Sequence, residues 1–297
     1  MRGFQLKPNE MMFFLDFNRT LVDYENEYDV SYNYASEEAI SAAERSQINI
    51  TKALLTFERK TGITPVICVV TNAHDSRFDF HGEQGIHNDL AMTFFRNPTN
   101  LPEEYLCRRF FKYLVYRENN YFYKINPTMP YHQIYEKVDF DETAKSINYI
   151  EQFKKKESVD RILSVVDPKK DTARAMIFAG DSIKDDYPMK EIVTPHGVSK
   201  IYIRPGKVQK LTYAIMREFA EAKGAEFESV NPRNGKRIIC TDQNTFNMLS
   251  PAEQMIVRDY NSGDVVFLTN PNSRGLAEGI IKSIDIINGS RPPEMGV

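Results

Sequence analysis

Three short, uninterrupted apolar runs constrain the fold of this chain more than any other feature of its sequence. They occupy residues 11–15, 66–70 and 175–179, and each is followed at once by a polar residue or a glycine. A run of this length without alternation is typical of a strand buried on both faces, as in a parallel sheet. Residues 36–62 carry apolar side chains at helical spacing, which predicts a helix. The pattern leaves open whether this helix is interrupted near Asn49. Strand, helix and strand in this order predict a doubly wound α/β fold.

Alternating strands and helices continue along the rest of the sequence. Residues 142–166 show helical spacing ahead of the third strand. Such alternation extends a parallel sheet and places helices on its faces. The role of residues 205–270 beyond this pattern is left open. The further predicted elements are strands at 200–203, 237–241 and 265–269 and helices at 208–223, 251–260 and 274–284.

A long segment between the second and third apolar runs has a different character. Residues 76–150 are rich in Tyr and Phe and are punctuated by Gly and Pro, which indicates an inserted module. The predicted fold class is therefore α/β, with a three-layer, Rossmann-like core, a parallel sheet and a smaller inserted α+β cap. The predicted domains are a discontinuous core at 1–75 and 151–290, a cap at 76–150 and a tail at 291–297.

Composition and charge argue against several classes of protein. A net charge of -3, without a block of Lys or Arg, gives no general attraction to a nucleic-acid backbone. Nowhere do about 18 apolar residues run together, so we expect no membrane span and no signal peptide, and the cytoplasm as the location. Three widely spaced cysteines match no zinc motif. The oligomeric state is not indicated.

Polar residues stand where the three predicted strands end. Asp16 follows the first strand, Thr71 closes the second, and Asp181 and Asp185 come just after the third. Ligands of open parallel sheets bind at the carboxyl ends of the strands, so these side chains are expected in one pocket. Clustered carboxylates repel each other, and a hard cation such as Mg²⁺ relieves that repulsion while neutralising a phosphoryl group. The pattern favours a magnesium and phosphate site.

These stretches resemble, in the correct order, motifs of the haloacid dehalogenase (HAD) superfamily. Residues 13–21, with the sequence FFLDFNRTL, are similar to the first motif, an apolar strand followed by DxDxT. Residues 69–72, VVTN, resemble the second motif. Residues 177–186, IFAGDSIKDD, resemble the fourth motif, an apolar strand followed by GDxxxD.

The third motif of this superfamily is a lysine ahead of the helix that precedes the last motif strand. Lys155 fits this place best, and Lys154 and Lys156 stay alternatives. The resemblance covers roughly residues 10–73 and 150–205. The position of the predicted insert resembles the subclass with a cap after the second motif.

The resemblance implies a Mg²⁺-dependent phosphatase that forms an aspartyl-phosphate at Asp16. Thr71 would orient the phosphoryl group, and Lys155 would offset negative charge. For Arg19, contact with the ligand and simple exposure are equal alternatives. The implied set is Asp16, Asn18, Thr71 and Lys155 as catalytic residues, Arg19, Thr20, Thr71 and Asn72 as substrate-binding residues, and Asp16, the Asn18 carbonyl, Asp181 and Asp185 as metal ligands.

Asn18 departs from the family pattern, in which a second Asp protonates the leaving group and then activates water. An amide cannot shuttle a proton, and such acid-base help is typically worth about 10² to 10⁴ in rate. Hydrolysis of a small phosphorylated metabolite, such as a sugar phosphate or a nucleotide, is the expected activity. The alternatives are a phosphotransferase on the same fold and a catalytically impaired module that binds a phosphorylated ligand.

Overall fold

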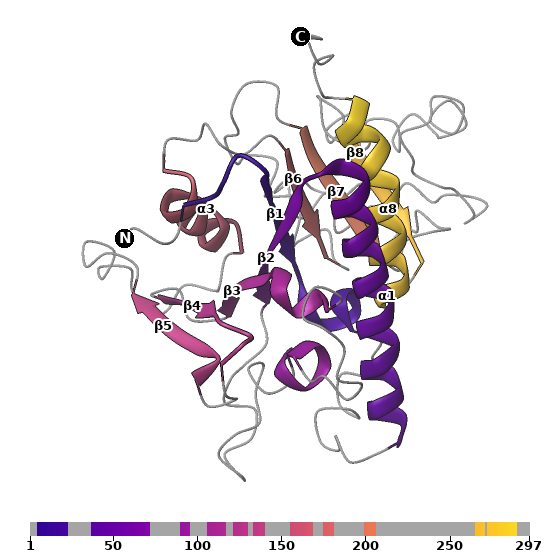
Figure 1. The fold of residues 1–297 in the computed structure, drawn as a ribbon, viewed down its shortest axis with the longest axis horizontal. Coiled ribbons are helices and arrows are strands. Elements are labelled where there is room, and N and C mark those ends of the chain that lie inside the picture. Colours follow the sequence, from indigo (N-terminus) through magenta and orange to yellow (C-terminus); the bar gives the residue numbers. More distant parts are fainter. Residues whose placement is uncertain are drawn as a thin grey trace, which may run out of the picture.

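A single eight-stranded sheet forms the centre of the molecule. The computed structural model describes residues 5–22, 37–71, 90–95, 106–116, 121–129, 133–139, 155–168, 175–180, 199–205, 265–270 and 272–289. Within these ranges the strand order is β5-β4-β3-β2-β1-β6-β7-β8 (Figure 1). The strands are β1 (Glu10–Leu15), β2 (Thr64–Thr71), β3 (Phe111–Tyr116), β4 (Tyr121–Ile125), β5 (Tyr135–Asp139), β6 (Ala175–Ala179), β7 (Ser199–Pro205) and β8 (Val265–Thr269).

The three apolar runs form the middle of this sheet, which confirms them as buried strands. β1 lies between β2 and β6, and both pairings are parallel. Phe13 is aligned with Ile67 on one side and with Ile177 on the other. The parallel arrangement continues from β6 to β8, so the predicted strands at 200–203 and 265–269 are also confirmed. Strands with neighbours on both sides and helices on both faces need apolar side chains throughout.

Helices cover both faces of the sheet and give an α/β architecture. α1 (Glu37–Thr61) and α8 (Asn272–Gly289) lie side by side on one face (Figure 1). α3 (Lys155–Val166) lies on the other side of the sheet in the same view. The α/β class is therefore confirmed.

α1 is continuous through Asn49, so the interruption that the sequence left open is absent. The Asn49 side chain points to α8, where its Nδ2 donates a hydrogen bond of 3.0 Å to Ser273 Oγ. The helix ends at Thr61, and Gly62, which follows it, has a left-handed φ of 64°. A glycine with this conformation is a common stop signal after a helix because it has no Cβ to clash.

Alternate residues of the central strands supply two separate apolar layers. On the face of α1 and α8, Phe13 meets Phe57 edge to face, with ring centroids 5.2 Å apart. On the face of α3, Phe14 stacks on Phe178 at 5.4 Å, and Phe178 stacks on Tyr202 at 5.5 Å. The change of face at each residue follows from the period of two in a strand. Asp16 continues the series of Phe14 and therefore starts from the α3 face.

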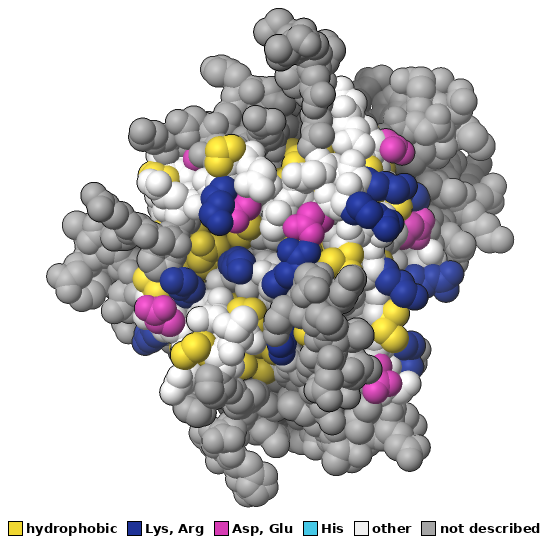
Figure 2. Space-filling view, in the orientation of Figure 1, with side chains coloured by type: hydrophobic (Ala, Val, Ile, Leu, Met, Phe, Trp, Pro, Cys, Tyr) yellow, Lys and Arg dark blue, Asp and Glu magenta, His cyan; other side chains and the backbone are white. Residues whose placement is uncertain are grey.

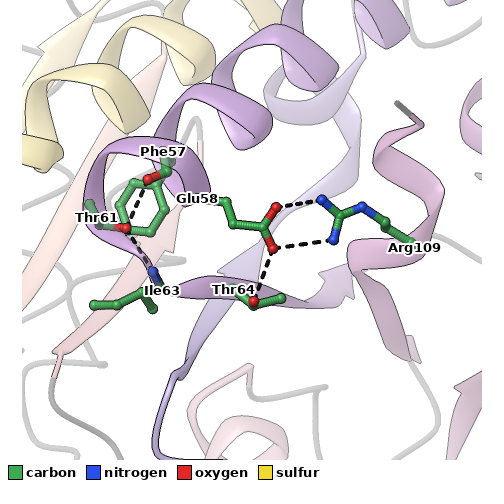
Figure 3. A network of polar contacts seen from close by, with 6 residues as sticks. All are labelled: Phe57, Glu58, Thr61, Ile63, Thr64 and Arg109. Carbon is green, nitrogen blue, oxygen red and sulfur yellow. Dashed lines mark hydrogen bonds and ion pairs between the residues drawn. The ribbon is translucent and has the colours of Figure 1, made fainter. Parts of the chain in front are cut away.

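A polar network joins α1 to the segment just before β3 (Figure 3). Both carboxylate oxygens of Glu58 accept hydrogen bonds from Arg109, one of them at 3.2 Å. Thr64 Oγ1 donates a third hydrogen bond to Glu58 at 2.9 Å. Burial alone would raise the pKa of Glu58, but the hydrogen bonds from Arg109 and Thr64 outweigh it, so this pKa lies below its ordinary value. The network ties two segments that are distant in sequence.

The strands between residues 111 and 139 differ from the predicted cap. β3 pairs in parallel with β2, and β4 pairs antiparallel with β3 and with β5. Buried side chains of this region, including Phe111 and Tyr116, pack in the same apolar cluster as Phe13. This part of the segment is an extension of the core sheet and not a separate module above it. The other parts of the predicted cap, at 76–89, 96–105, 117–120, 130–132 and 140–150, lie outside the described residues.

Several other predicted elements also lie outside the described residues. They are the helices at 208–223 and 251–260, the strand at 237–241 and the tail at 291–297. α3 matches the described end of the helix predicted at 142–166, and α8 contains the one predicted at 274–284.

Surface charge bears on nucleic-acid binding, and the length and apolar character of the helices bear on membrane spans. On the face shown in Figure 2, Lys and Arg side chains are interspersed with Asp and Glu side chains. Among the described helices, none combines the length and the apolar character needed to span a membrane. The cytoplasmic location stays a prediction.

Candidate active site

Asp16 lies at the carboxyl end of the central strand, where neighbouring strand ends meet. Its backbone N–H donates a hydrogen bond of 2.8 Å to the carbonyl oxygen of Ala179, the last residue of β6. The side chain is 9% exposed. Pairing with β6 therefore fixes the backbone of Asp16, and only a small part of its side chain is exposed to solvent.

Lys155 forms an ion pair with Asp16, from 139 positions further along the sequence. Its Nζ lies 2.7 Å from Asp16 Oδ1, and the lysine side chain is only 10% exposed. Lys155 is the first residue of α3, and Ser158 and Val159, three and four positions on, are buried. Residues at this spacing share one face of a helix, so Lys155 shares the inner face of α3.

The neighbouring lysine points elsewhere. Lys156 Nζ lies 3.5 Å from Asp160 Oδ2 within the same helix, and these side chains are 31% and 43% exposed. The third alternative, Lys154, lies outside the described residues. Of the lysines that the structure describes in this run, Lys155 is the one that meets Asp16.

The Asp16–Lys155 pair is a poor means of stabilising a fold. Withdrawing two charges from water costs free energy that their attraction only partly repays, and apolar residues of similar size are often as good or better. A buried carboxylate with a cation at hydrogen-bond distance is, however, suited to catalysis, because the cation can offset charge that develops during a reaction. The pair is thus a candidate site on physical grounds.

The turn Phe17–Leu21 follows Asp16 directly and carries three further predicted site residues. It closes with a hydrogen bond of 3.3 Å from the Val22 N–H to the Phe17 carbonyl oxygen. Asn18 is partly exposed and Arg19 is exposed, whereas Thr20 is fully buried. Within the part of the chain that the structure describes, Thr20 Oγ1 has no hydrogen-bond partner.

Thr71 lies at the end of β2, the strand next to β1. It is 1% exposed and is aligned across the sheet with Tyr116, the last residue of β3. Tyr116 stacks on Tyr123 with ring centroids 5.6 Å apart, and their hydroxyl oxygens are 3.2 Å apart. An aromatic pair therefore lies on β3 and β4, on the side of Thr71 that faces away from β1. The sequence had predicted that both tyrosines belong to the inserted cap.

Arg204 on β7 was missed as a site candidate. It is 2% exposed and lies near the carboxyl end of its strand, directly after Ile203, whose carbonyl accepts a hydrogen bond of 3.3 Å from the Gly180 N–H. Lys200, on the same strand, is also buried. The signal was present in the sequence: two basic residues four positions apart in an otherwise apolar strand share one face.

Some predicted site residues lie outside the described residues, namely Asn72, Asp181 and Asp185. In the described ranges, no group of three or more His, Cys, Asp or Glu side chains is placed to hold a metal ion. Two of the four predicted ligands are described, the Asp16 carboxylate and the Asn18 backbone carbonyl. Both offer hard oxygen atoms, the ligand type that Mg²⁺ prefers, so the donor chemistry fits this ion.

The described site thus brings together Asp16 and Lys155 in direct contact, the turn that contains residues 18–20, and the strand end that carries Thr71. These groups share the carboxyl edge of a parallel sheet, where open α/β folds bind ligands. Comparisons of the chain with known protein families, with curated proteins and with solved structures find no match.

Proposed function

We propose that this chain is a Mg²⁺-dependent phosphatase of the HAD type that hydrolyses small phosphorylated metabolites. The observation that carries the proposal is the buried ion pair of Asp16 with Lys155 at the carboxyl edge of the sheet. The first and third motifs of the resemblance are far apart in sequence, and this contact unites them. The order of β2, β1 and β6 also brings the strands of the second and fourth motifs to either side of Asp16.

Asp16 acts as the nucleophile in this proposal. A carboxylate oxygen attacks phosphorus, the bond from phosphorus to the ester oxygen breaks, and the leaving oxygen takes the electron pair and then a proton. Water next attacks phosphorus of the aspartyl-phosphate, which releases inorganic phosphate and restores Asp16. Covalent catalysis of this kind replaces one difficult displacement by two easier ones.

Lys155 and Thr71 support this chemistry without forming covalent bonds. The Lys155 ammonium group offsets negative charge when a phosphoryl group approaches Asp16, and its low exposure strengthens that effect. Thr71 orients a phosphoryl oxygen from the next strand. Mg²⁺, held by Asp16, the Asn18 carbonyl, Asp181 and Asp185, would supply further neutralisation of phosphoryl charge.

Asn18 favours a second candidate function, in which hydrolysis is slow or absent. The Asn18 side chain is partly exposed in the turn that follows Asp16, where the family has its acid-base aspartate. An amide there leaves protonation of the leaving group and activation of water to solvent. Two activities would remain with an amide at position 18. They are transfer of the phosphoryl group to an alcohol and binding of a phosphorylated ligand without turnover.

The experiment that tests the proposal measures hydrolysis of para-nitrophenyl phosphate and of a panel of sugar and nucleotide phosphates, with Mg²⁺ and with EDTA. We expect Mg²⁺-dependent release of phosphate that is abolished in Asp16→Asn. Asp160→Asn is the matched control, because Asp160 is an exposed acid that pairs with Lys156. Equal activity of Asp16→Asn and the unaltered chain would refute the proposal.

A further inference from the structure

We propose that Arg204 binds the phosphoryl group that reacts at Asp16, as a second cation in addition to Lys155. The inference rests on the proposed function and deepens it, because it adds a phosphoryl-binding residue from a strand that carries none of the four motifs. It is carried by the register of β1, β6 and β7, by the face of the sheet from which Arg204 starts and by the burial of its charge.

Arg204 lies in the same row of the sheet as Asp16. The Asp16 N–H donates a hydrogen bond of 2.8 Å to the Ala179 carbonyl oxygen, which aligns Asp16 with Gly180. The Gly180 N–H donates one of 3.3 Å to the Ile203 carbonyl oxygen, which aligns Gly180 with Arg204. Asp16, Gly180 and Arg204 therefore form one row across three parallel strands, at the carboxyl edge.

The side chains of Arg204 and Asp16 start from the same face of the sheet. Tyr202 stacks on Phe178, and Phe178 stacks on Phe14, in the apolar layer on the α3 face. Arg204 comes two residues after Tyr202 in β7. Asp16 comes two residues after Phe14, so both side chains continue on the α3 face.

The row leaves room for an anion between its two charged members. Two strand spacings put the Cα atoms of Asp16 and Arg204 about 10 Å apart. Gly180, between them, has no side chain to separate them. Lys155 belongs to α3, which contacts β2, whereas Arg204 lies on β7, so the two cations start from opposite sides of Asp16. A phosphoryl group at Asp16 would meet one cation from each side.

The burial of Arg204 calls for a reason other than stability. Its exposed fraction is 2%, and withdrawal of a guanidinium group from water costs free energy that a partner only partly repays. Arg204 interacts with other parts of the protein, and its five N–H donors allow it to serve an anion at the same time. A guanidinium group matches phosphate oxygens with two parallel hydrogen bonds, so a phosphoryl site explains an arginine at this edge.

Lys200 offers a matched control on the same strand. It is 7% exposed and starts from the same face of β7, four positions before Arg204. Its row contains Met176 and Met12, so it crosses the apolar middle of the sheet. Lys200→Met and Arg204→Met each remove one buried cation, but only Arg204→Met removes it from the row of Asp16.

The test measures the dissociation constant of inorganic phosphate by calorimetry, with Mg²⁺ present. We expect Arg204→Met to weaken phosphate binding about 10- to 100-fold, the range of a charge-assisted hydrogen bond, and Lys200→Met to leave it unchanged. Arg204→Lys keeps the charge that the fold has buried and loses the planar fork, so it provides a folded variant if Arg204→Met unfolds. It should weaken phosphate binding about 3- to 10-fold.

Equal phosphate binding by the unaltered chain and both Arg204 variants would overturn the inference while leaving hydrolysis through Asp16 intact. A loss in Lys200→Met as large as that in Arg204→Met would overturn it as well, because the effect would then follow from any buried cation of β7. Equal hydrolysis by Asp16→Asn and the unaltered chain would instead overturn the proposed function. A chain that neither hydrolyses phosphate esters nor binds phosphate would overturn both.

Discussion

Replacement of Lys155 by methionine tests the ion pair at the centre of the candidate site. Methionine keeps the length of the side chain and removes the charge that lies 2.7 Å from Asp16. At this separation and an effective dielectric constant of about 20, the gross attraction of two unit charges is about 6 kcal/mol. Desolvation offsets part of it, and removal of one partner of a buried pair typically costs about 3–5 kcal/mol. For a chain of this size we expect a fall in melting temperature of roughly 10 °C.

Lys156→Met is the matched control, because it removes the same charge one position away. Lys156 pairs with Asp160 at 3.5 Å on an exposed face, where such a pair is worth about 0.5 kcal/mol or less. The assay is urea unfolding of both variants, together with phosphatase turnover. Lys155→Met should lower turnover about 10²- to 10³-fold, as for loss of one electrostatic contact in an active site, and Lys156→Met should leave it unchanged.

A double-mutant cycle with Asp16→Asn isolates the contribution of the pair. The coupling free energy between the two changes should be about 2–3 kcal/mol, because the residues are in direct contact. Equal loss of stability in Lys155→Met and Lys156→Met, or a coupling near zero, would refute the assignment of Lys155 as the partner of Asp16.

Two further changes test the fold around the site. Glu58→Gln weakens the network with Arg109 and should cost about 1 kcal/mol at pH 7. Because the pKa of Glu58 is lowered from 4.5, its stabilisation is present above pH 4.5 and is lost as the pH falls through the lowered value. The difference in unfolding free energy between Glu58→Gln and the unaltered chain should therefore vanish in acid, and a constant difference down to pH 3 would be inconsistent with this network. Gly279→Ala would place a Cβ 2.4 Å from Ile203 Cγ2 and should destabilise the chain by about 1–3 kcal/mol. Gly289→Ala, with nothing within 4 Å of its Cβ, should change stability by less than about 0.5 kcal/mol, and thermal melts that fail to separate the two would argue against close packing of α8 on β7.

The central strands could be predicted because each of them is apolar along its whole length. The runs at 11–15, 66–70 and 175–179 all became neighbouring parallel strands, and the helix from residue 37 to 61 connects the first two. The sequence alone left open whether this helix is interrupted near the polar residue Asn49. Contact with Ser273 explains that residue, and such a contact with a distant helix cannot be read from local sequence.

The strands β3 to β5 were assigned to the wrong unit because their neighbours are set by long-range pairing. β3 joins β2 across about 40 residues, and its register includes an irregularity between Ile67 and Cys68. A hairpin signal was present, since two aromatic-rich runs, now β3 and β4, are separated by only four residues. Nothing in that local pattern states which edge of a sheet the hairpin extends.

The sequence could have separated Lys155 more clearly from Lys154 and Lys156 as the partner of Asp16. Val159, Ile162, Leu163 and Val166 define the inner face of α3, and Lys155 lies four positions before Val159 on that face. Lys156 shares its spacing with Asp160 instead. The distance between Lys155 and Asp16 depends on how α3 packs on the sheet, and that is a tertiary property.

Hydrolysis by the Asn18→Asp variant, alone and combined with Asp16→Asn, tests the central claim most directly. An aspartate at position 18 restores a group that can shuttle a proton, and such help is typically worth about 10² to 10⁴ in rate. The account predicts that Asn18→Asp raises Mg²⁺-dependent release of para-nitrophenolate from para-nitrophenyl phosphate, and that adding Asp16→Asn abolishes it. Release that persists without the Asp16 carboxylate would contradict the account.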